Sequence, residues 1–343
     1  MSIKNIHRNS FSDTPTTIKR KVGNTLYDIK KAYTKINGNL VLVWDIGNNF
    51  EIEVARNDSG SMVMGFNTSC FLDANNNAIE FSVDFGDGTV IEKYDGEQET
   101  YAEGIDKATI KIKAEKLETL TLPWHAGYTT GDTYIKVLKL SLPDGLKTIG
   151  DYSCYGLNSC TSISIPNTVV SIGKWGFKDC YKSIFTLPTK LETIGVNAFD
   201  NCTSLTEVTI PESVNFVGDY AFYQCTGLKK VIINQSCAIS NYNFYQCELL
   251  SEVVISNNVT AIGNNVFYGC KALTSITIPD SVNSIGYYVF DGKYIRTINC
   301  NFTRQELVQK CALSQVIVDF QDGVIYTFHC TDGDIFLNGS DFR

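Results

Sequence analysis

The sequence lacks any long apolar segment. No stretch approaches the roughly 18 consecutive apolar residues that a membrane-spanning helix requires, although 43% of the 343 residues are hydrophobic. The first residues, MSIKNIHRNSFSDTPTTIKRK, also lack the apolar core of a secretory signal peptide. We therefore expect no membrane insertion. We also expect a protein made in a reducing cytoplasm that leaves it only by lysis or inside a particle.

Residue patterns that carry catalysis are scarce as well. The three histidines, His7, His125 and His329, lie far apart, and no G-x-S-x-G, H-E-x-x-H or P-loop motif occurs. Zinc sites need paired cysteine or histidine spacing, whereas the 12 cysteines here are mostly solitary. A glycosidase-type pair of carboxylates is still an alternative, because the fold can bring together any two acidic residues. The sequence predicts a non-enzymatic protein without a cofactor or a metal.

Charge is unevenly distributed along the chain. Residues 1–36 hold eight Lys or Arg against two Asp, about +6, and the remaining residues hold 21 basic and 35 acidic side chains, about −14. A basic arm predicts docking on an acidic partner, with a solvated tail as the alternative, and the acidic body argues against nucleic acid as a ligand. The candidate anchor residues are Lys19, Arg20, Lys21, Lys30, Lys31 and Lys35.

A repeat of 22 or 23 residues fills much of the C-terminal half. An Ile-Gly or Val-Gly pair recurs at this spacing from Gly150 to Gly286, with Ser240 in place of one glycine. A phenylalanine and, three residues later, a cysteine recur with it: Phe177, Phe199, Phe222, Phe244, Phe267 and Phe290, and Cys180, Cys202, Cys225, Cys247 and Cys270. Such self-similarity with one strand per unit indicates a leucine-rich-repeat solenoid, and the fold class is mostly β.

The pattern within one repeat predicts which side chains face inward. In LTSITIPDSVNSIGYYVFDG, alternation buries Ile276 and Ile278 and exposes Thr277, as a half-buried strand requires. Further inward positions are Val282, Ile285, Val289 and Phe290. Gly286 is expected to allow a turn that a β-carbon would resist. Because one repeat cannot bury its own apolar side, the repeats must stack, with a parallel sheet on one face and tight turns on the other.

The recurrent cysteine could serve in a disulfide framework, in metal binding or in the core. Without secretion a disulfide framework is disfavoured, and without paired spacing so is metal. A buried free cysteine behaves as a small hydrophobic residue. We therefore expect Cys202, Cys225, Cys247 and Cys270 to be reduced and buried.

The repeat unit resembles a known family. AFDNCTSLTEVTIPESVNFVGDYAF (198–222) is similar to the BspA-type (Treponema pallidum-type) leucine-rich repeats of bacterial surface proteins, and the resemblance covers about 145–300. It implies adhesion to host cells or glycans. The region after Gly292, which includes FTRQELVQKCALSQVIVDFQDGVIYTFHC, is expected to form a short helix and strands that cap the open end.

Two further resemblances concern the N-terminal third. VDFGDGT (83–89) is similar to the signature of PKD-like β-sandwich modules, where Asp-Gly marks a tight turn. Calcium binding by Asp73, Asp84 and Asp87 is an alternative reason for these acidic residues. VGNTLYDIKKAYTKINGNLVLVWD (22–45) predicts a hairpin around Asn37-Gly38. It resembles short hairpin repeats near the start of phage tail and virion proteins. That resemblance implies a virion component that attaches through its arm to other virion proteins.

Variable positions of the repeat suggest a binding surface. Two positions before the phenylalanine and one position after it, aromatic residues predominate, and in a helical turn these positions would share one face. Tyrosine provides a rigid contact area with a polar tip, which suits protein and sugar ligands, although the rings could merely cover adjacent turns. The candidate binding residues are Trp175, Tyr220, Tyr223, Tyr242, Tyr245, Tyr268 and Tyr288.

The outward row of the sheet is a second candidate surface. Its β-branched, weakly charged side chains suit a flat protein contact, and an unpartnered sheet face is equally ordinary. The row and the row beside it comprise Ser164, Thr186, Thr209, Ile232, Val254 and Thr277, and Ser162, Ile184, Glu207, Lys230, Glu252 and Ser275.

Together these features predict a basic anchor hairpin (1–45), a PKD-like sandwich (46–120), a solenoid (121–300) and a C-terminal cap (301–343). The predicted function is a phage head fibre, tail fibre or decoration protein that displays a repeat surface to a host-cell glycan or protein. The alternatives are a bacterial surface adhesin with an unusual export route and, from another class, a carbohydrate-active enzyme. Self-association into a homo-oligomer stays open.

Overall fold

The computed structural model describes residues 135–301, 303–310 and 325–338, and strands that lie between residues 18 and 120. Side chains are described for Leu120 and for residues 137–301, 303–307 and 327–336. The chain divides into two compact units, Met1–Gly47 and Asn48–Arg343. We describe each unit by itself.

The first unit consists of two antiparallel hairpins. β1 (Ile18–Val22) pairs with β2 (Thr25–Ile29), and β3 (Lys31–Ile36) pairs with β4 (Asn39–Asp45). Since Ile36 faces Asn39, the loop between them is Asn37-Gly38, and the predicted hairpin is confirmed. The side chains of the candidate anchor residues lie outside the described residues, so docking through them stays a prediction.

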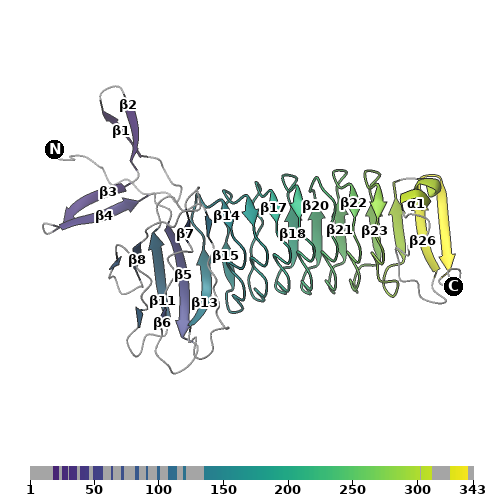
Figure 1. The fold of residues 1–343 in the computed structure, drawn as a ribbon, viewed down its shortest axis with the longest axis horizontal. Helices are drawn as coiled ribbons and strands as arrows, with labels where there is room; N and C mark the ends of the chain where they lie inside the picture. Colours follow the sequence, from purple (N-terminus) through teal and green to yellow (C-terminus); the bar gives the residue numbers. More distant parts are fainter. Residues whose placement is uncertain are drawn as a thin grey trace. The chain divides into compact units, whose positions relative to one another are not determined.

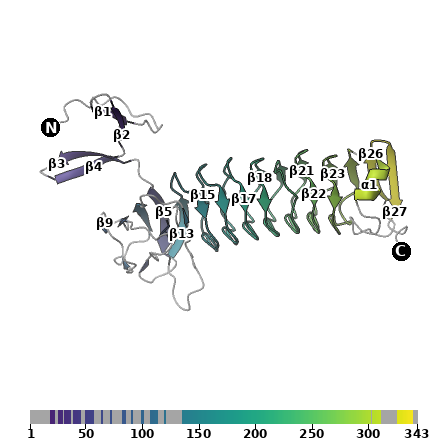
Figure 2. The ribbon, with the colours of Figure 1, turned by 45° about the horizontal axis from the view of Figure 1, so that its top comes forward.

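The second unit is a solenoid in which each repeat adds one turn of chain (Figure 1, Figure 2). A line of longer parallel strands runs along one side, and its pattern of one buried residue between two exposed ones matches the predicted alternation. These strands are β15 (Ser162–Ser164), β18 (Glu207–Ile210), β20 (Lys230–Ile233), β21 (Glu252–Ile255), β23 (Ser275–Ile278) and β25 (Thr297–Cys300).

The repeats also form a second line of strands, which the sequence had not suggested. Two-residue parallel strands lie at the recurrent Ile-Gly pair, where tight turns alone were expected. They are β12 (Thr119–Leu120), β14 (Thr148–Ile149), β16 (Ser171–Ile172), β17 (Thr193–Ile194), β19 (Phe216–Val217), β22 (Ala261–Ile262) and β24 (Ser284–Ile285). Each repeat therefore carries two strands.

Close approach between repeats explains the glycine in this second line. A β-carbon on Gly218 would lie 2.4 Å from the backbone nitrogen of Val196, and one on Gly286 would lie 2.6 Å from the carbonyl carbon of Gly263. Neither glycine is among the residues with positive φ. The expectation that a β-carbon would not be tolerated at Gly286 is confirmed, and the reason is the close approach of the preceding turn rather than a positive φ.

Strands from the region 46–120 extend both lines of the solenoid. β13 (Ile135–Ser141) pairs with β15 on one side and with β5 (Asn49–Arg56) on the other. Beyond β5, the same sheet continues in the order β11 (Lys107–Lys113), β8 (Ser82–Asp84) and β9 (Val90–Ile91). β12 pairs with β14 and with β7 (Phe71–Leu72), and β6 (Val63–Met64) pairs with β10 (Glu99–Thr100). Both sheets thus continue across residue 120. The PKD-like module stays a prediction, and the side chains of Asp73, Asp84 and Asp87 lie outside the described residues.

A helix and a hairpin close the C-terminal end, as predicted. α1 (Arg304–Lys310) follows β25, and β26 (Ile325–Cys330) then pairs in parallel with β25 and antiparallel with β27 (Gly333–Asn338). In Figure 2, α1, β26 and β27 lie beyond the last repeat. They cover the edge strand that an open solenoid would expose.

Stacked phenylalanines form the centre of the core. From Phe177 to Phe290, successive rings lie 5.1–5.9 Å apart with interplanar angles of 3–9°. All six are essentially inaccessible to solvent. The predicted inward residues Ile276, Val282 and Ile285 are buried as well.

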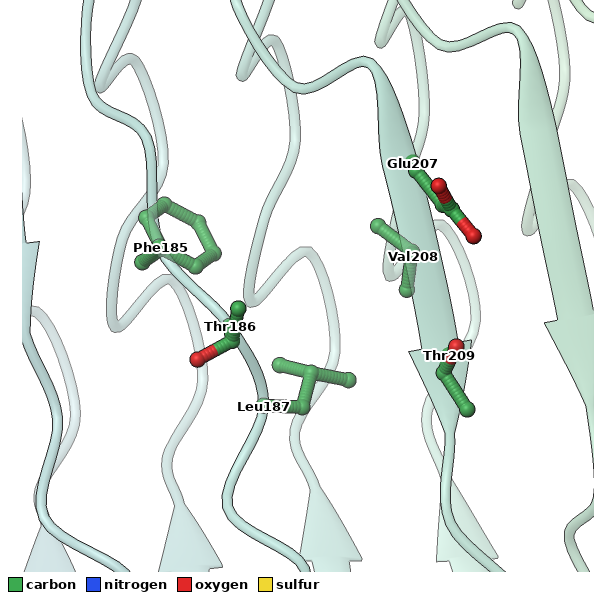
Figure 3. A pocket seen from close by; sticks show the side chains of 6 residues that line it. All are labelled: Phe185, Thr186, Leu187, Glu207, Val208 and Thr209. Atoms are coloured by element: carbon green, nitrogen blue, oxygen red, sulfur yellow. The ribbon is translucent and has the colours of Figure 1, made fainter.

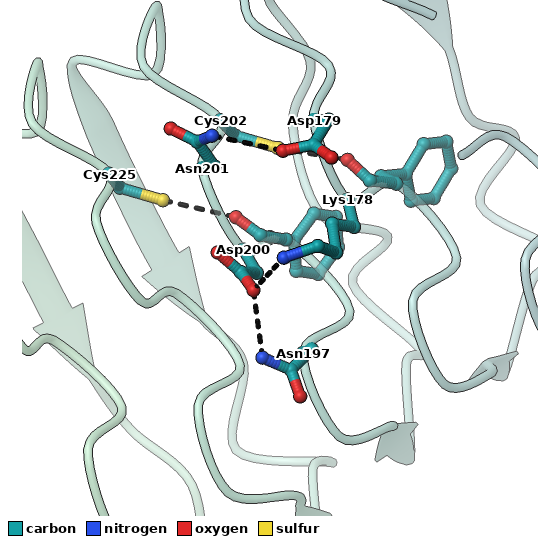
Figure 4. A network of polar contacts seen from close by, with 9 residues as sticks. Lys178, Asp179, Asn197, Asp200, Asn201, Cys202 and Cys225 are labelled. Atoms are coloured by element: carbon teal, nitrogen blue, oxygen red, sulfur yellow. Dashed lines mark hydrogen bonds and ion pairs between the residues drawn. The ribbon is translucent and has the colours of Figure 1, made fainter. Parts of the chain in front are cut away.

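The recurrent cysteines are free thiols buried beside this stack, so their predicted burial is confirmed. Cys180 donates to the carbonyl of Cys154, and each later thiol donates to the phenylalanine carbonyl of the preceding repeat. Cys202 Sγ lies 3.1 Å from the oxygen of Phe177 and Cys225 Sγ 3.2 Å from that of Phe199 (Figure 4). Burial raises the pKa of Cys225 to about 12. The position therefore favours a residue that is small and apolar and can still donate a weak hydrogen bond.

Candidate functional site: a tyrosine ridge

The backbone is left-handed on either side of the core phenylalanines from Phe177 to Phe267. Tyr220 has φ 61° and Gln224 has φ 54°, and equivalent values recur in the other repeats. The segment is therefore an irregular turn rather than a helical one. The two positions still share a face, as was inferred for a helical turn, because the rings of Tyr220 and Tyr223 lie 5.6 Å apart. Positive φ costs a non-glycine residue free energy, so the packing between repeats must impose it.

Hydrogen bonds between repeats impose this conformation. The N–H groups of Tyr220, Phe222 and Gln224 donate to carbonyls of the following turn over 2.9, 3.0 and 2.9 Å. The side chains of Gln224 and Gln246 are joined over 2.7 Å as well. Because every second N–H bonds to the next turn, equivalent side chains are held in register along the solenoid.

Five of the candidate tyrosines lie together, and we call this group the tyrosine ridge: Tyr220, Tyr223, Tyr242, Tyr245 and Tyr268. The rings of Tyr220 and Tyr242 stack at 4.6 Å with an interplanar angle of 4°. In a second column, Tyr245 stacks on Tyr223 at 5.3 Å and on Tyr268 at 5.6 Å. Inclined ring contacts of 5.6 Å join the two columns. The ridge is thus a preformed surface two tyrosines wide.

The tyrosines of the ridge are half-buried. Desolvation raises the pKa of the Tyr220 and Tyr223 phenols, and the adjacent Tyr242 and Tyr245 raise it further. Both hydroxyls therefore stay neutral under physiological conditions and can donate and accept hydrogen bonds.

The other two candidate aromatic residues stand apart from the ridge. Trp175 packs edge-on against Tyr152 at 4.6 Å, with Lys174 Nζ 4.8 Å from its ring centroid. Tyr288 is 45% exposed, and the equivalent position between it and Tyr242 is Asn265. Tyr152, which sequence reasoning missed, lies two residues before Cys154 and would have aligned with Trp175 if cysteine had been accepted in place of phenylalanine.

A buried carboxylate adjoins one end of the ridge. Asp200 occupies the position of Tyr223 one repeat earlier; Lys178 forms an ion pair with it, and Asn197 Nδ2 donates to it over 2.8 Å (Figure 4). Desolvation raises the pKa of Asp200, although Lys178 and Asn197 oppose that rise. Asp200 also contributes to the raised pKa of Tyr223. This polar cluster terminates the aromatic column.

Lys178→Met should lower the free energy of unfolding by about 2 kcal/mol near pH 7, since Asp200 would keep its charge without a cation. The loss should shrink as the pH falls. The pKa of Asp200 in the folded protein lies above the unfolded value of about 4. As the pH falls, the folded protein therefore takes up this proton before the unfolded chain does, and this uptake stabilises the folded state. Urea unfolding at several pH values measures this. Adding Asp200→Asn to the variant should remove the pH dependence; its persistence would contradict the assignment.

The sheet face contains a shallow depression. β18 is an edge strand of the sheet β18–β20–β21, and the preceding repeat contacts β15 through a single bridge at Ile184. A cavity of about 310 Å³ lies at this interruption (Figure 3). Its lining residues are Phe185, Thr186, Leu187, Glu207, Val208 and Thr209. Ile184, which is 66% exposed, and Val254, which is 44% exposed, lie in the predicted outward rows. The sheet face therefore stays a second candidate surface.

Metal-binding clusters are absent from the described side chains. No group of three or more His, Cys, Asp or Glu residues within them could hold a metal ion. His329 Nδ1 lies 2.8 Å from Asp334 Oδ1 on the exposed cap hairpin, and His7 and His125 lie outside the described residues. No helix in the described part of the chain is long and apolar enough to cross a membrane.

The sequence of the repeat region identifies the family to which the chain belongs. Residues 133–240 and 237–316 match the BspA type leucine rich repeat region in six copies, which covers more than half of the chain. The chain belongs to this family. BspA-type repeat proteins are typically non-enzymatic binding proteins. A comparison with curated proteins gives no match.

Several solved structures are similar to this BspA-type protein. A leucine-rich repeat protein from Bacteroides ovatus has 21% identity and a TM-score of 0.41; the alignment covers 70% of this chain and 65% of that one, so this chain spans just under two thirds of that protein's length. A leucine-rich repeat protein from T. pallidum has 25% identity and a TM-score of 0.34, over 40% and 78% of the two chains. A leucine rich cell surface protein from Faecalibacterium prausnitzii has 16% identity and a TM-score of 0.28, over 77% and 96%.

Proposed function

We propose that this BspA-type protein is a non-enzymatic adhesion protein that binds a protein partner through its tyrosine ridge. The observation that supports the proposal is the pair of stacked tyrosine columns, which are held in register and half-buried before any partner arrives. A preformed surface loses little conformational entropy on binding, and tyrosine is enriched at protein interfaces.

Ring stacking favours a protein partner over a glycan. A sugar binds an aromatic residue by lying on an open ring face, because the face carries the attractive negative charge. Both faces of Tyr245 are covered, one by Tyr223 and the other by Tyr268. The ridge presents ring edges and hydroxyl groups, which suit the mixed apolar and hydrogen-bonding surface of a folded protein.

The site of display is a separate part of the proposal. We favour display on a bacterial cell surface, because the repeat family resembles surface proteins, and residues 1–45 would attach the protein to a larger assembly. Attachment to a phage virion is the second candidate, and the basic hairpins β1–β2 and β3–β4 favour it. Mass spectrometry of purified virions and immunogold labelling of cells separate the two. Absence from virions and presence on the envelope would exclude the virion.

Chemical treatment of the target cells tests the partner class. Labelled protein is added to cultured epithelial cells and to bacteria, after protease treatment or after periodate oxidation of surface glycans. We expect binding to be lost after protease and kept after periodate. Binding that survives protease but is lost after periodate would identify a glycan ligand and contradict the proposal, as would a complete lack of binding to untreated cells.

A further inference from the structure

One cysteine pair departs from the arrangement of the others. Along the core, each recurrent thiol donates to a backbone carbonyl, as Cys247 does to Phe222 over 3.3 Å and Cys270 to Phe244 over 3.2 Å. Cys330 instead contacts the side chain of Cys300 within hydrogen-bonding distance.

Strand pairing places these two side chains together. In the parallel pair β25–β26, Asn299 lies opposite His329, and Cys300 and Cys330 are the next residues of the two strands. Residues directly opposite on neighbouring strands have α-carbons about 5 Å apart, within the range that a disulfide spans. The end of β26 is fixed by Asp332, whose Oδ1 accepts the N–H of Arg304 over 2.8 Å.

The two thiols differ in their access to solvent. Cys300 is 4% exposed and belongs to the core, whereas Cys330 is half-buried at the cap hairpin. A reagent in solution can therefore reach Cys330 first, and Cys300 lies behind it as the resolving thiol.

We propose that Cys300 and Cys330 are a disulfide-forming pair that locks the C-terminal cap onto the last repeat. The oxidant is a small-molecule disulfide such as glutathione disulfide. The Cys330 thiolate attacks one sulfur of the reagent, forms a mixed disulfide and releases one glutathione thiolate, which takes up a proton. The Cys300 thiolate then attacks Cys330 Sγ, forms the protein disulfide and releases the second glutathione. Two thiols are oxidised and one disulfide is reduced, so the exchange balances.

The bond would join the last repeat to a hairpin that follows it after 30 residues. Closing a loop of that length removes conformational freedom from the unfolded chain, so the cap should unfold less readily. Desolvation raises the pKa of Cys330, so the reaction should be faster at mildly alkaline than at neutral pH.

Incubation of the full chain with glutathione disulfide tests the proposal. Peptide mapping without reduction should recover a Cys300–Cys330 linked peptide, and the oxidised protein should melt about 5 °C higher than the reduced protein. Cys300→Ser should leave only glutathione attached to Cys330. The lone half-buried Cys237 serves as the matched control and should form a mixed disulfide only. The proposal would be overturned if Cys330 were found linked to a cysteine other than Cys300. It would also be overturned if, in the unsubstituted protein, Cys330 carried glutathione and no Cys300–Cys330 disulfide formed.

Discussion

Replacing Phe222 with alanine is expected to lower the free energy of unfolding by about 3–5 kcal/mol. Its ring is fully buried between Phe199 at 5.1 Å and Phe244 at 5.5 Å. The vacated space cannot readily collapse, because the N–H of Phe222 donates to the following turn and the turns are fixed at this spacing. Urea denaturation followed by circular dichroism measures the loss.

The neighbouring residue provides the control for this prediction. Tyr223→Ala removes a ring of similar size from the half-buried ridge, so it should lower the free energy of unfolding by about 1 kcal/mol, the contribution of a surface aromatic contact. Equal losses for the two variants would contradict the division of each turn into a structural phenylalanine and a surface tyrosine.

The sequence predicted the elements that depend on repetition. Phe290 was predicted to face inward in a unit that stacks on its neighbours, and the burial of the equivalent rings from Phe177 to Phe290 confirms it. Alternation at Ile276, Thr277 and Ile278 predicted the orientation of β23 correctly. Both inferences succeed because stacked copies of one unit must bury the same positions.

The sequence did not predict features that arise between repeats. Left-handed φ at Tyr220 and Tyr242 is contrary to the local preference of tyrosine, and hydrogen bonds from neighbouring turns impose it. The second line of strands depends on how closely Gly218 lets the preceding turn approach. Trp175 and Tyr288 were candidate binding residues, but Asn197 and Asn265 occupy the equivalent positions between them and the tyrosine ridge, so the aromatic column does not reach them.

The largest functional effect is expected from removal of the outer tyrosine column. Replacing Tyr223, Tyr245 and Tyr268 together with alanine should weaken binding to cells about 100-fold or more, since each tyrosine at the centre of an interface contributes about 1 kcal/mol or more. The loss should be smaller than the sum of the three single substitutions, because each ring fixes the next through stacking and each single substitution therefore already disturbs its neighbours.

A matched triple variant separates the ridge from general surface hydrophobicity. Tyr181, Phe216 and Tyr287 are exposed aromatic residues outside the ridge. Their joint replacement with alanine removes three aromatic rings but leaves both columns intact. Its binding should equal that of the unsubstituted protein.

The decisive measurement is therefore a titration of labelled protein on untreated cells, with three proteins compared: unsubstituted, ridge variant and matched control, each checked for an unchanged folded circular dichroism spectrum. We expect the ridge variant alone to lose affinity, by about 100-fold or more. Equal affinity of the ridge variant and the unsubstituted protein would contradict the proposed role of the tyrosines and leave them as a covering of the solenoid core.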